Sequence, residues 1–343
     1  MFLNVVRAAG FMVLSLFLAV GTPAEAQQAK YVAKLGHLEA PTQPRHMGLV
    51  KVAALVKERT QGEVEFQLYP ASQLGNARQM NEGVQLGTLE ATVMPGGFLG
   101  GFNPVVSVLD IPFLMPADRA LAQKLREGAM GKAVLDSFAS RGFVAIGIWP
   151  NGRKNITSNK PLDTADAMKG QRFRVMDSKI LVEQFNGVGA SAIPINFGEL
   201  YTALQTGVVD GQENPLDTIY TMKFHEVQKN LLITDHGVLD DIILFNPGWW
   251  NRLPASHREV IVKTFDEARP EVERTKEAAQ KTALDGIKTG TIQVRETSEA
   301  DRQKLRALMY PKARAAFLER AGTEGQKVIQ IYEEELKRLG IPN

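Results

Sequence analysis

The chain has 343 residues, of which 44% are hydrophobic, and this composition is typical of a globular protein with buried cores. The formal net charge is only +2, and no run of Lys and Arg is long enough to indicate binding to nucleic acid. Cysteine is absent, which excludes disulfides, cysteine-ligated zinc, thiol nucleophiles and iron–sulfur sites.

The N-terminus predicts export. Arg7 precedes an apolar stretch over 11–20, and Ala24-Glu25-Ala26 follows, which is the order of a secretory signal peptide. The apolar stretch is shorter than the ~20 residues of a membrane-spanning helix, and an uncleaved anchor is the alternative. We predict a signal peptide over 1–26 and, since no cysteine for lipid attachment follows, a soluble mature protein in a Gram-negative periplasm.

The first part of the mature chain alternates short strands with helices, which predicts an α/β lobe. Gly62 and Gly87 follow the two helical patterns, and Gly87 stands where a left-handed residue commonly ends a helix. Apolar spacing predicts a strand over 31–35, a helix over 44–58, a strand over 64–69, a helix over 76–86 and a strand over 89–93.

A later segment repeats this pattern. Asn196 with Glu199 predicts a capping box, and Gly207 ends the helix that follows. Two units of similar layout predict two lobes that face each other across a central cleft. The elements are a strand over 172–175, a helix over 178–186, an extended segment over 192–195, a helix after Asn196 and a strand over 208–210.

The remaining segments connect and cover these lobes. A strand over 142–149 leaves the first lobe, and a helix over 256–285 contains Pro270, which should kink it. A short strand over 291–294 and helices over 300–339 follow. The predicted fold is α/β, with two lobes, a central cleft and a long kinked helix spanning both. We predict lobe I over 27–151 and 240–279, and lobe II over 152–239 and 280–343.

Patterns of catalytic residues are absent from the sequence. It has no H-E-x-x-H zinc motif, no Gly-x-Ser-x-Gly nucleophile and no P-loop. The glycine-rich stretch 96–101 lacks dinucleotide-binding spacing and is interpreted as a flexible loop at the cleft rim. Asp240 and Asp241 should point to opposite faces of a strand, and we interpret them as a solvated strand end. The prediction is a protein that is not an enzyme and that has no cofactor and no metal site.

Two motifs identify the family. Residues 169–175 read K-G-Q-R-F-R-V, and residues 197–215 read F-G-E-L-Y-T-A-L-Q-T-G-V-V-D-G-Q-E-N-P. This order resembles the DctP family of substrate-binding proteins of TRAP (tripartite ATP-independent periplasmic) transporters, over nearly the whole mature chain. The resemblance implies the two-lobed periplasmic-binding-protein fold. It also implies a receptor that closes on a small organic-acid anion and delivers it to the transporter's membrane subunits.

The resemblance implies that Arg174, on the strand after Lys-Gly, binds the ligand's carboxylate. A guanidinium group suits this role because its planar fork of donors matches a carboxylate and stays charged. Strand alternation puts Arg172 on the same face as Arg174, so periodicity alone leaves both open.

The family also implies contacts from three other residues of the second half. Arg153 follows the strand that leaves the first lobe, and Asn214 would supply an amide ahead of Pro215. Phe197 would form a wall of the pocket, and its alternative role is a hydrophobic staple on the helix that follows.

Four further residues are candidates by their position. His37, Asn76 and Met94 lie at the ends of predicted strands or starts of helices, where ligands collect in open α/β sheets. His236 lies where the chain recrosses between the lobes. A structural role is the alternative for each. With no acid beside His37 and Asn76, the site favours neutral or anionic hydroxylated acids over amino-bearing ligands.

The sequence therefore predicts a periplasmic receptor for a dicarboxylate, a sugar acid, or a keto or hydroxy acid. Its partners are the TRAP membrane subunits, and nucleic acid is not among them. The alternatives are a ligand-presenting component of a sensor and, with less support from the residues, a periplasmic enzyme on the same fold.

Overall fold

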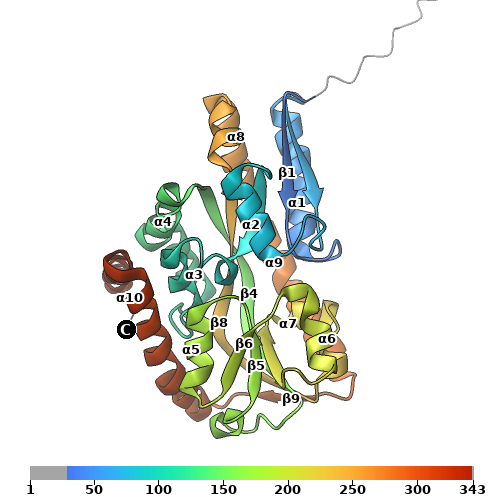
Figure 1. Cartoon of the computed structure of the whole chain (residues 1–343), viewed down its shortest axis with the longest axis vertical. Coiled ribbons are helices and arrows are strands. Elements are labelled where there is room, and N and C mark those ends of the chain that lie inside the picture. Colours follow the sequence, from blue (N-terminus) through green and yellow to red (C-terminus); the bar gives the residue numbers. More distant parts are fainter. Residues whose placement is uncertain (1–28, 342–343) are drawn as a thin grey trace, which may run out of the picture.

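One mixed β-sheet runs through the whole molecule in the computed structural model, which describes residues 29–341 (Figure 1). The strand order is β2-β1-β3-β8-β4-β7-β5-β6, and β9 pairs with β8. The strands are β1 Tyr31–Gly36, β2 Val64–Tyr69, β3 Ala91–Pro95, β4 Val144–Ser158, β5 Arg172–Val175, β6 Ser191–Pro194, β7 Gly211–Asn214, β8 Asn230–Phe245 and β9 Gln293–Glu296.

The two long strands β4 and β8 join two smaller groups of strands. β1 pairs in parallel with β2 and β3, and this group forms lobe I. β5 pairs in parallel with β6 and β7, and this group forms lobe II. β4 and β8 pair antiparallel along both lobes, with irregular register between Pro150 and Arg153, where they cross from one lobe to the other. The predicted two-lobed α/β fold is confirmed.

Helices cover both faces of the sheet, and α9 extends along both lobes (Figure 1). It packs on α1 of lobe I and on α7 of lobe II, and it contains Pro270. The helices are α1 Pro44–Arg59, α2 Ala77–Leu86, α3 Arg119–Glu127, α4 Ala129–Asp136, α5 Lys179–Gly187, α6 Leu200–Gln205, α7 Leu216–Thr221, α8 Pro247–Arg252, α9 Ala255–Lys288 and α10 Glu299–Arg338.

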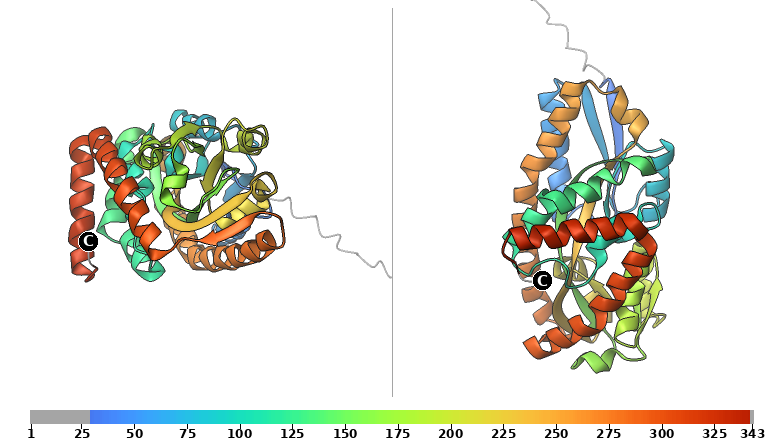
Figure 2. Two further views of the ribbon diagram at one scale, coloured as in Figure 1. Left: turned by 90° about the horizontal axis from the view of Figure 1, so that it is seen from below. Right: turned by 90° about the vertical axis from the view of Figure 1, so that its left-hand side faces the viewer.

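The last helix, α10, is bent into two arms at Gly322, whose φ of 56° is outside the helical range (Figure 2). The first arm packs on α5 of lobe II. The second arm packs on α4 of lobe I, where the Glu335 carboxylate accepts bonds from the first backbone N–H groups of that helix. The predicted division assigns 280–343 to lobe II, although this second arm lies against lobe I. The lobe boundaries stay a prediction.

Local signals differ in how well they predict these elements. Asn76 and Gln79 form a reciprocal capping box at α2, and Gly87 ends that helix with a φ of 83°. The capping box predicted at Asn196 is wrong, because its amide donates to the Glu199 side chain and a 3₁₀ turn precedes α6. The strand predicted over 208–210 is also wrong, because the chain is still in a turn there and β7 begins at Gly211.

The interpretation of Asp240 and Asp241 as a solvated strand end is wrong. Both carboxylates are buried inside β8, on opposite faces of the strand. Arg126 from α3 pairs with Asp240 at 2.9 Å, and Arg45 from α1 pairs with Asp241 at 2.5 Å. Distant segments therefore supply the charges that allow this strand to be buried.

The predicted signal peptide lies outside the described residues. Within residues 29–341, no helix is long and apolar enough to cross a membrane. The same residues contain no group of three or more His, Asp or Glu side chains arranged to hold a metal ion.

Candidate ligand-binding site

A small cavity lies between the two lobes, where side chains from both converge. Its volume is about 20 Å³, which is room for about one water molecule. The lining residues are Leu38, Glu39, Arg45, Pro95 and Phe98 from lobe I, Asn151 and Leu239 from the crossing strands, and Arg174, Met176, Phe197, Asn214 and Thr218 from lobe II.

Arg174, on β5, is the buried cation of the lobe II wall, with only 1% of its surface exposed. Its Nε donates to the Ile195 carbonyl at 2.9 Å, while Nη2 has no hydrogen-bond partner among the described residues. Burial lowers the pKa of Arg174 to about 10, so the guanidinium is still charged at neutral pH. Because an unpaired buried charge is costly, this group is disposed to bind an anion.

Two aromatic rings flank this guanidinium. Phe98 of lobe I lies 5.8 Å from the Arg174 guanidinium carbon, and Phe197 of lobe II lies 6.0 Å from it. At these distances the ring faces attract the cation and help to hold it in place. The wall around Arg174 is therefore aromatic and contains contributions from both lobes.

The structure separates the two arginines that the strand pattern leaves open. Arg172 is partly exposed at the start of β5, where it pairs with Asp210 at 3.3 Å and donates to the Gly207 carbonyl at 2.8 Å. Arg174 lies at the cavity. The Arg172 side chain therefore lies at the protein surface, whereas the Arg174 side chain, two residues further along β5, lies between the lobes.

Of the other candidates from the sequence, Asn214 and Phe197 line the cavity with Arg174. Asn214 is held by a bond from its amide to the Gln212 side chain at 2.5 Å. Phe197 also packs edge to face on Phe224, with ring centroids 6.1 Å apart. Phe197 thus contacts both the cavity and the core of its own lobe.

Three candidates lie elsewhere. Arg153 donates to the Pro116 carbonyl and lines a separate hollow beside α9. Asn76 caps α2 and lines a hollow at the rim of the lobes. Met94 is fully buried in an apolar core cluster. None of the three is among the residues that line the cavity.

The two candidate histidines are buried and do not line the cavity. His37 is bonded to His46 at 3.0 Å, and burial, with Arg45 nearby, lowers its pKa to about 3. His236 is bonded to Glu213 at 2.7 Å, and burial lowers its pKa despite that carboxylate. Both rings hold neighbouring side chains in place.

Sequence reasoning does not find Glu39 and Arg45, which line the cavity from lobe I. They follow the end of β1, the edge of a parallel sheet where ligands commonly bind, and this position is the signal that could have indicated them. The expectation that no acid lies beside His37 is therefore wrong, because Glu39 is close enough to affect that histidine. Glu39 lies 3.5 Å from Arg45 and 3.4 Å from Lys276 of α9.

The lobes are closed on each other around this cavity. Ser178 at the start of α5 donates to the Asp110 carboxylate of lobe I at 2.7 Å. A Cβ on Gly97 of lobe I would come within 2.6 Å of the Met176 methyl group of lobe II, so the two lobes are in close contact here. Because the enclosed space is so small, ligand entry requires the lobes to separate.

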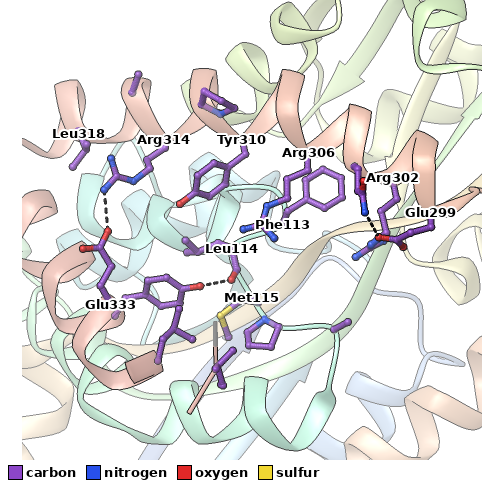
Figure 3. Close-up of a pocket in the computed structure, with 18 residues that line it drawn as sticks. Phe113, Leu114, Met115, Glu299, Arg302, Arg306, Tyr310, Arg314, Leu318 and Glu333 are labelled. Carbon is purple, nitrogen blue, oxygen red and sulfur yellow. Dashed lines mark hydrogen bonds and ion pairs between the residues drawn. The ribbon is translucent and has the colours of Figure 1, made fainter. Parts of the chain in front are cut away.

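A larger hollow, of about 870 Å³, lies between the two arms of α10 and the segment 113–117 (Figure 3). Two of its arginines already have polar partners, and Arg306 lies over the Tyr310 ring. Arg302 lies over the Phe113 ring and donates to a backbone carbonyl, and Arg314 pairs with Glu333 at 3.1 Å. The smaller interlobe cavity is the better candidate, because its donors lack partners.

A family model supplies the identification. The bacterial extracellular solute-binding proteins of family 7 (DctP) match residues 35–320. The chain belongs to this family. It is 32% identical to the C4-dicarboxylate-binding periplasmic protein DctP of Rhodobacter capsulatus, over 90% of this chain and 92% of that protein.

Solved structures of TRAP periplasmic solute-binding proteins agree. The chain is 64% identical, with a TM-score of 0.89, to a TRAP periplasmic solute-binding protein of Desulfovibrio salexigens with bound orotic acid. That match covers 90% of this chain and 99% of the other. A TRAP solute-binding protein of Sulfurospirillum deleyianum with bound succinate is 28% identical, with a TM-score of 0.82, over 89% and 99% of the two chains.

The predicted family and receptor function are confirmed. The chain is a periplasmic solute-binding protein that binds a small organic-acid anion and works with the membrane subunits of a TRAP transporter. Family 7 is a family of bacterial extracellular solute-binding proteins.

The contact between Asp110 and Ser178 predicts a pH effect on this solute-binding protein. Burial raises the pKa of Asp110 to about 6, with Glu213 and Asp240 adding to the effect and Lys154 opposing it. The ordinary value, and hence the unfolded one, is about 3.9. The folded state therefore gains stability from protonation as pH falls from about 6 to about 4, and above pH 6 the ionised carboxylate costs stability.

At pH 8, Asp110→Asn should therefore have a free energy of unfolding on the order of 3 kcal/mol higher than wild type, and a higher unfolding temperature. The difference should shrink to about 0.5 kcal/mol near pH 4, where Asp110 is protonated in the folded state and about half protonated in the unfolded state. Thermal unfolding at pH 8 and pH 4 checks this expectation. A variant less stable than wild type at pH 8 would contradict it, because the bond from Ser178 to the charged carboxylate would then outweigh the cost of burial.

Proposed function

We propose that this chain captures a flat monocarboxylate of the orotate type, with Arg174 bound to the ligand's carboxylate. The observation that carries this proposal is the buried guanidinium of Arg174, which lacks a partner at Nη2 and lies between Phe98 and Phe197. The 64% identity to the Desulfovibrio salexigens protein with bound orotic acid supports the choice of ligand.

The apolar part of the cavity wall offers surface to a flat ring once the lobes stand further apart than in this closed form, whose cavity has room for about one water molecule. Phe98 and Phe197 offer aromatic surface, and Leu38, Met176 and Leu239 offer aliphatic and thioether surface. Burying a ring among such side chains is favourable, and an aromatic ligand can stack on an aromatic neighbour. The Asn214 amide beside Arg174 can bond a ligand carbonyl or carboxylate oxygen.

In this proposal the lobes separate where β4 and β8 cross between them, near 151–152 and 239–240. The ligand enters the open cleft, and contacts from both lobes then favour the closed form by a shift of population. The protein carries its ligand to the membrane subunits without changing it. Cleavage after Ala26 would release the mature receptor, 27–343, into a Gram-negative periplasm.

Isothermal titration of the mature chain with orotate, succinate and galactonate tests the proposed ligand. We expect one orotate per chain and weaker binding of the other two acids. At one hundred times its Kd, orotate should stabilise the protein by about 2.7 kcal/mol in thermal unfolding. If succinate or galactonate binds and orotate does not, the ligand class is wrong, although the receptor function stands.

A further inference from the structure

The lobe I wall of the cavity carries polar groups that no hydrogen bond satisfies. Arg45 and Glu39 are 2% and 4% exposed, and both line the cavity. Arg45 Nε and Glu39 Oε2 have no hydrogen-bond partner among the described residues, and neither has Oδ1 of Asn151 beside them. Buried polar atoms without partners are costly, so this wall offers a donor and two acceptors to a ligand.

The charges of this wall are already balanced. Arg45 lies 2.5 Å from Asp241 and 3.5 Å from Glu39. Lys276 lies 2.6 Å from Asp217 and 3.4 Å from Glu39. Two cations thus face three carboxylates, and no positive charge is left over. A second carboxylate on the ligand would lie beside Glu39 without a free cation, and burying it there is unfavourable.

We infer that Glu39 and Arg45 determine specificity by binding a neutral ligand edge that presents a carbonyl oxygen next to an N–H group. Arg45 Nε donates to the carbonyl, and Glu39 accepts from the N–H. The 2,4-dioxopyrimidine ring of orotate has such an edge, so this inference rests on the proposed function and extends it. Arg174 of lobe II then binds the carboxylate. The Glu39–Arg45 wall of lobe I discriminates against dicarboxylates and against acids that lack a carbonyl next to an N–H group.

The rejection should be strong for a physical reason. A site built to bond a polar edge leaves its own buried groups unpaired when the edge is missing, which penalises the wrong ligand. Benzoate is a flat monocarboxylate without the edge, and succinate is a dicarboxylate. Together with orotate they separate the contribution of each wall.

Isothermal titration of the mature chain and two variants tests the inference. Glu39→Gln and Asp241→Asn each remove one negative charge from the same buried network, but only Glu39 lines the cavity. Glu39→Gln should weaken orotate binding tenfold or more and change benzoate binding by less than threefold. Asp241→Asn should leave orotate binding within threefold and strengthen succinate binding about tenfold, because Arg45 loses its carboxylate partner.

If this network had only a structural role, both variants would change the affinities for orotate, benzoate and succinate by similar factors. That result would overturn the inference. Wild-type protein that binds succinate as tightly as orotate would overturn it as well. A wild type that binds orotate and benzoate equally would overturn the role of the edge while leaving the proposed function intact. A wild type that binds neither ring acid would refute the proposed ligand class and the inference with it.

Discussion

Replacing Arg174 by methionine should weaken ligand binding by about 30-fold or more and leave the unliganded protein at least as stable as wild type. The first effect follows from the loss of the buried cation that we propose binds the carboxylate. Truncating one partner of a buried, hydrogen-bonded charge pair costs about 2–5 kcal/mol of binding free energy. At 1.4 kcal/mol per tenfold, affinity should fall about 30-fold or more.

The second effect distinguishes a binding residue from a structural one. The structure gives Arg174 no carboxylate within ion-pair distance among the described residues, and burial lowers its pKa to about 10. An unpaired buried charge costs stability, so an apolar side chain of similar length should relieve that cost while keeping contacts with Phe98 and Phe197. The bond from Nε to the Ile195 carbonyl is lost in exchange.

Titration with orotate and urea unfolding without ligand measure these two effects separately. Arg172→Met is the matched control, because Arg172 lies on the same strand but pairs with Asp210 at the surface. That control should keep its affinity within about threefold. Loss of affinity in Arg172→Met together with full binding by Arg174→Met would show that the anchor has been assigned to the wrong arginine.

The sequence predicts the fold well because its main signals are local. Helix α2 follows from its cap at Asn76 and its end at Gly87, and both are set by residues within one turn. β8 has no comparable local signal. Asp240 and Asp241 interrupt its apolar pattern, and the arginines that allow their burial come from α1 and α3, far away in the sequence.

The site is only partly predictable for the same reason. Resemblance to the family indicates Arg174, Phe197 and Asn214, because their motifs are continuous in the chain. A motif does not predict where a side chain points. Arg153 follows the strand as the family pattern implies, but its side chain extends away from the cavity and donates to the Pro116 carbonyl. Glu39 and Arg45 follow the end of β1, a position that points to a site, but their ion pairs with Asp241 and Lys276 depend on β8 and α9, far away in the sequence.

Replacing Lys154 by methionine should cause the largest loss of stability among single changes near the crossing strands. Lys154 of β4 is 1% exposed, and its Nζ lies 2.8 Å from Glu213 of β7. Burial alone would raise the pKa of Glu213, but Lys154 and the bond from His236 outweigh burial and hold it at about 2. Glu213 thus depends on its cation to stay ionised inside the protein.

Among residues 29–341, the Glu213 carboxylate without Lys154 keeps its bonds from His236, at 2.7 Å, and from Gln184, at 2.6 Å, and no others. Breaking a buried ion pair by removing one partner costs about 3–5 kcal/mol, which urea unfolding should record as a lower midpoint with an unchanged slope. Lys132→Met is the control: its pair with Asp136 is exposed, and its loss should cost no more than about 0.5 kcal/mol.

The double variant Lys154→Met/Glu213→Gln shows whether the lost stability comes from the unpaired Glu213 carboxylate or from lost packing of the Lys154 side chain. If the cost arises from a carboxylate left without its cation, neutralising Glu213 should recover a substantial part of the stability lost in Lys154→Met. If the double variant is no more stable than the single one, the cost lies instead in the packing of the Lys154 side chain between β7 and β8. The ion pair would then contribute little of its own to holding lobe II on the crossing strands.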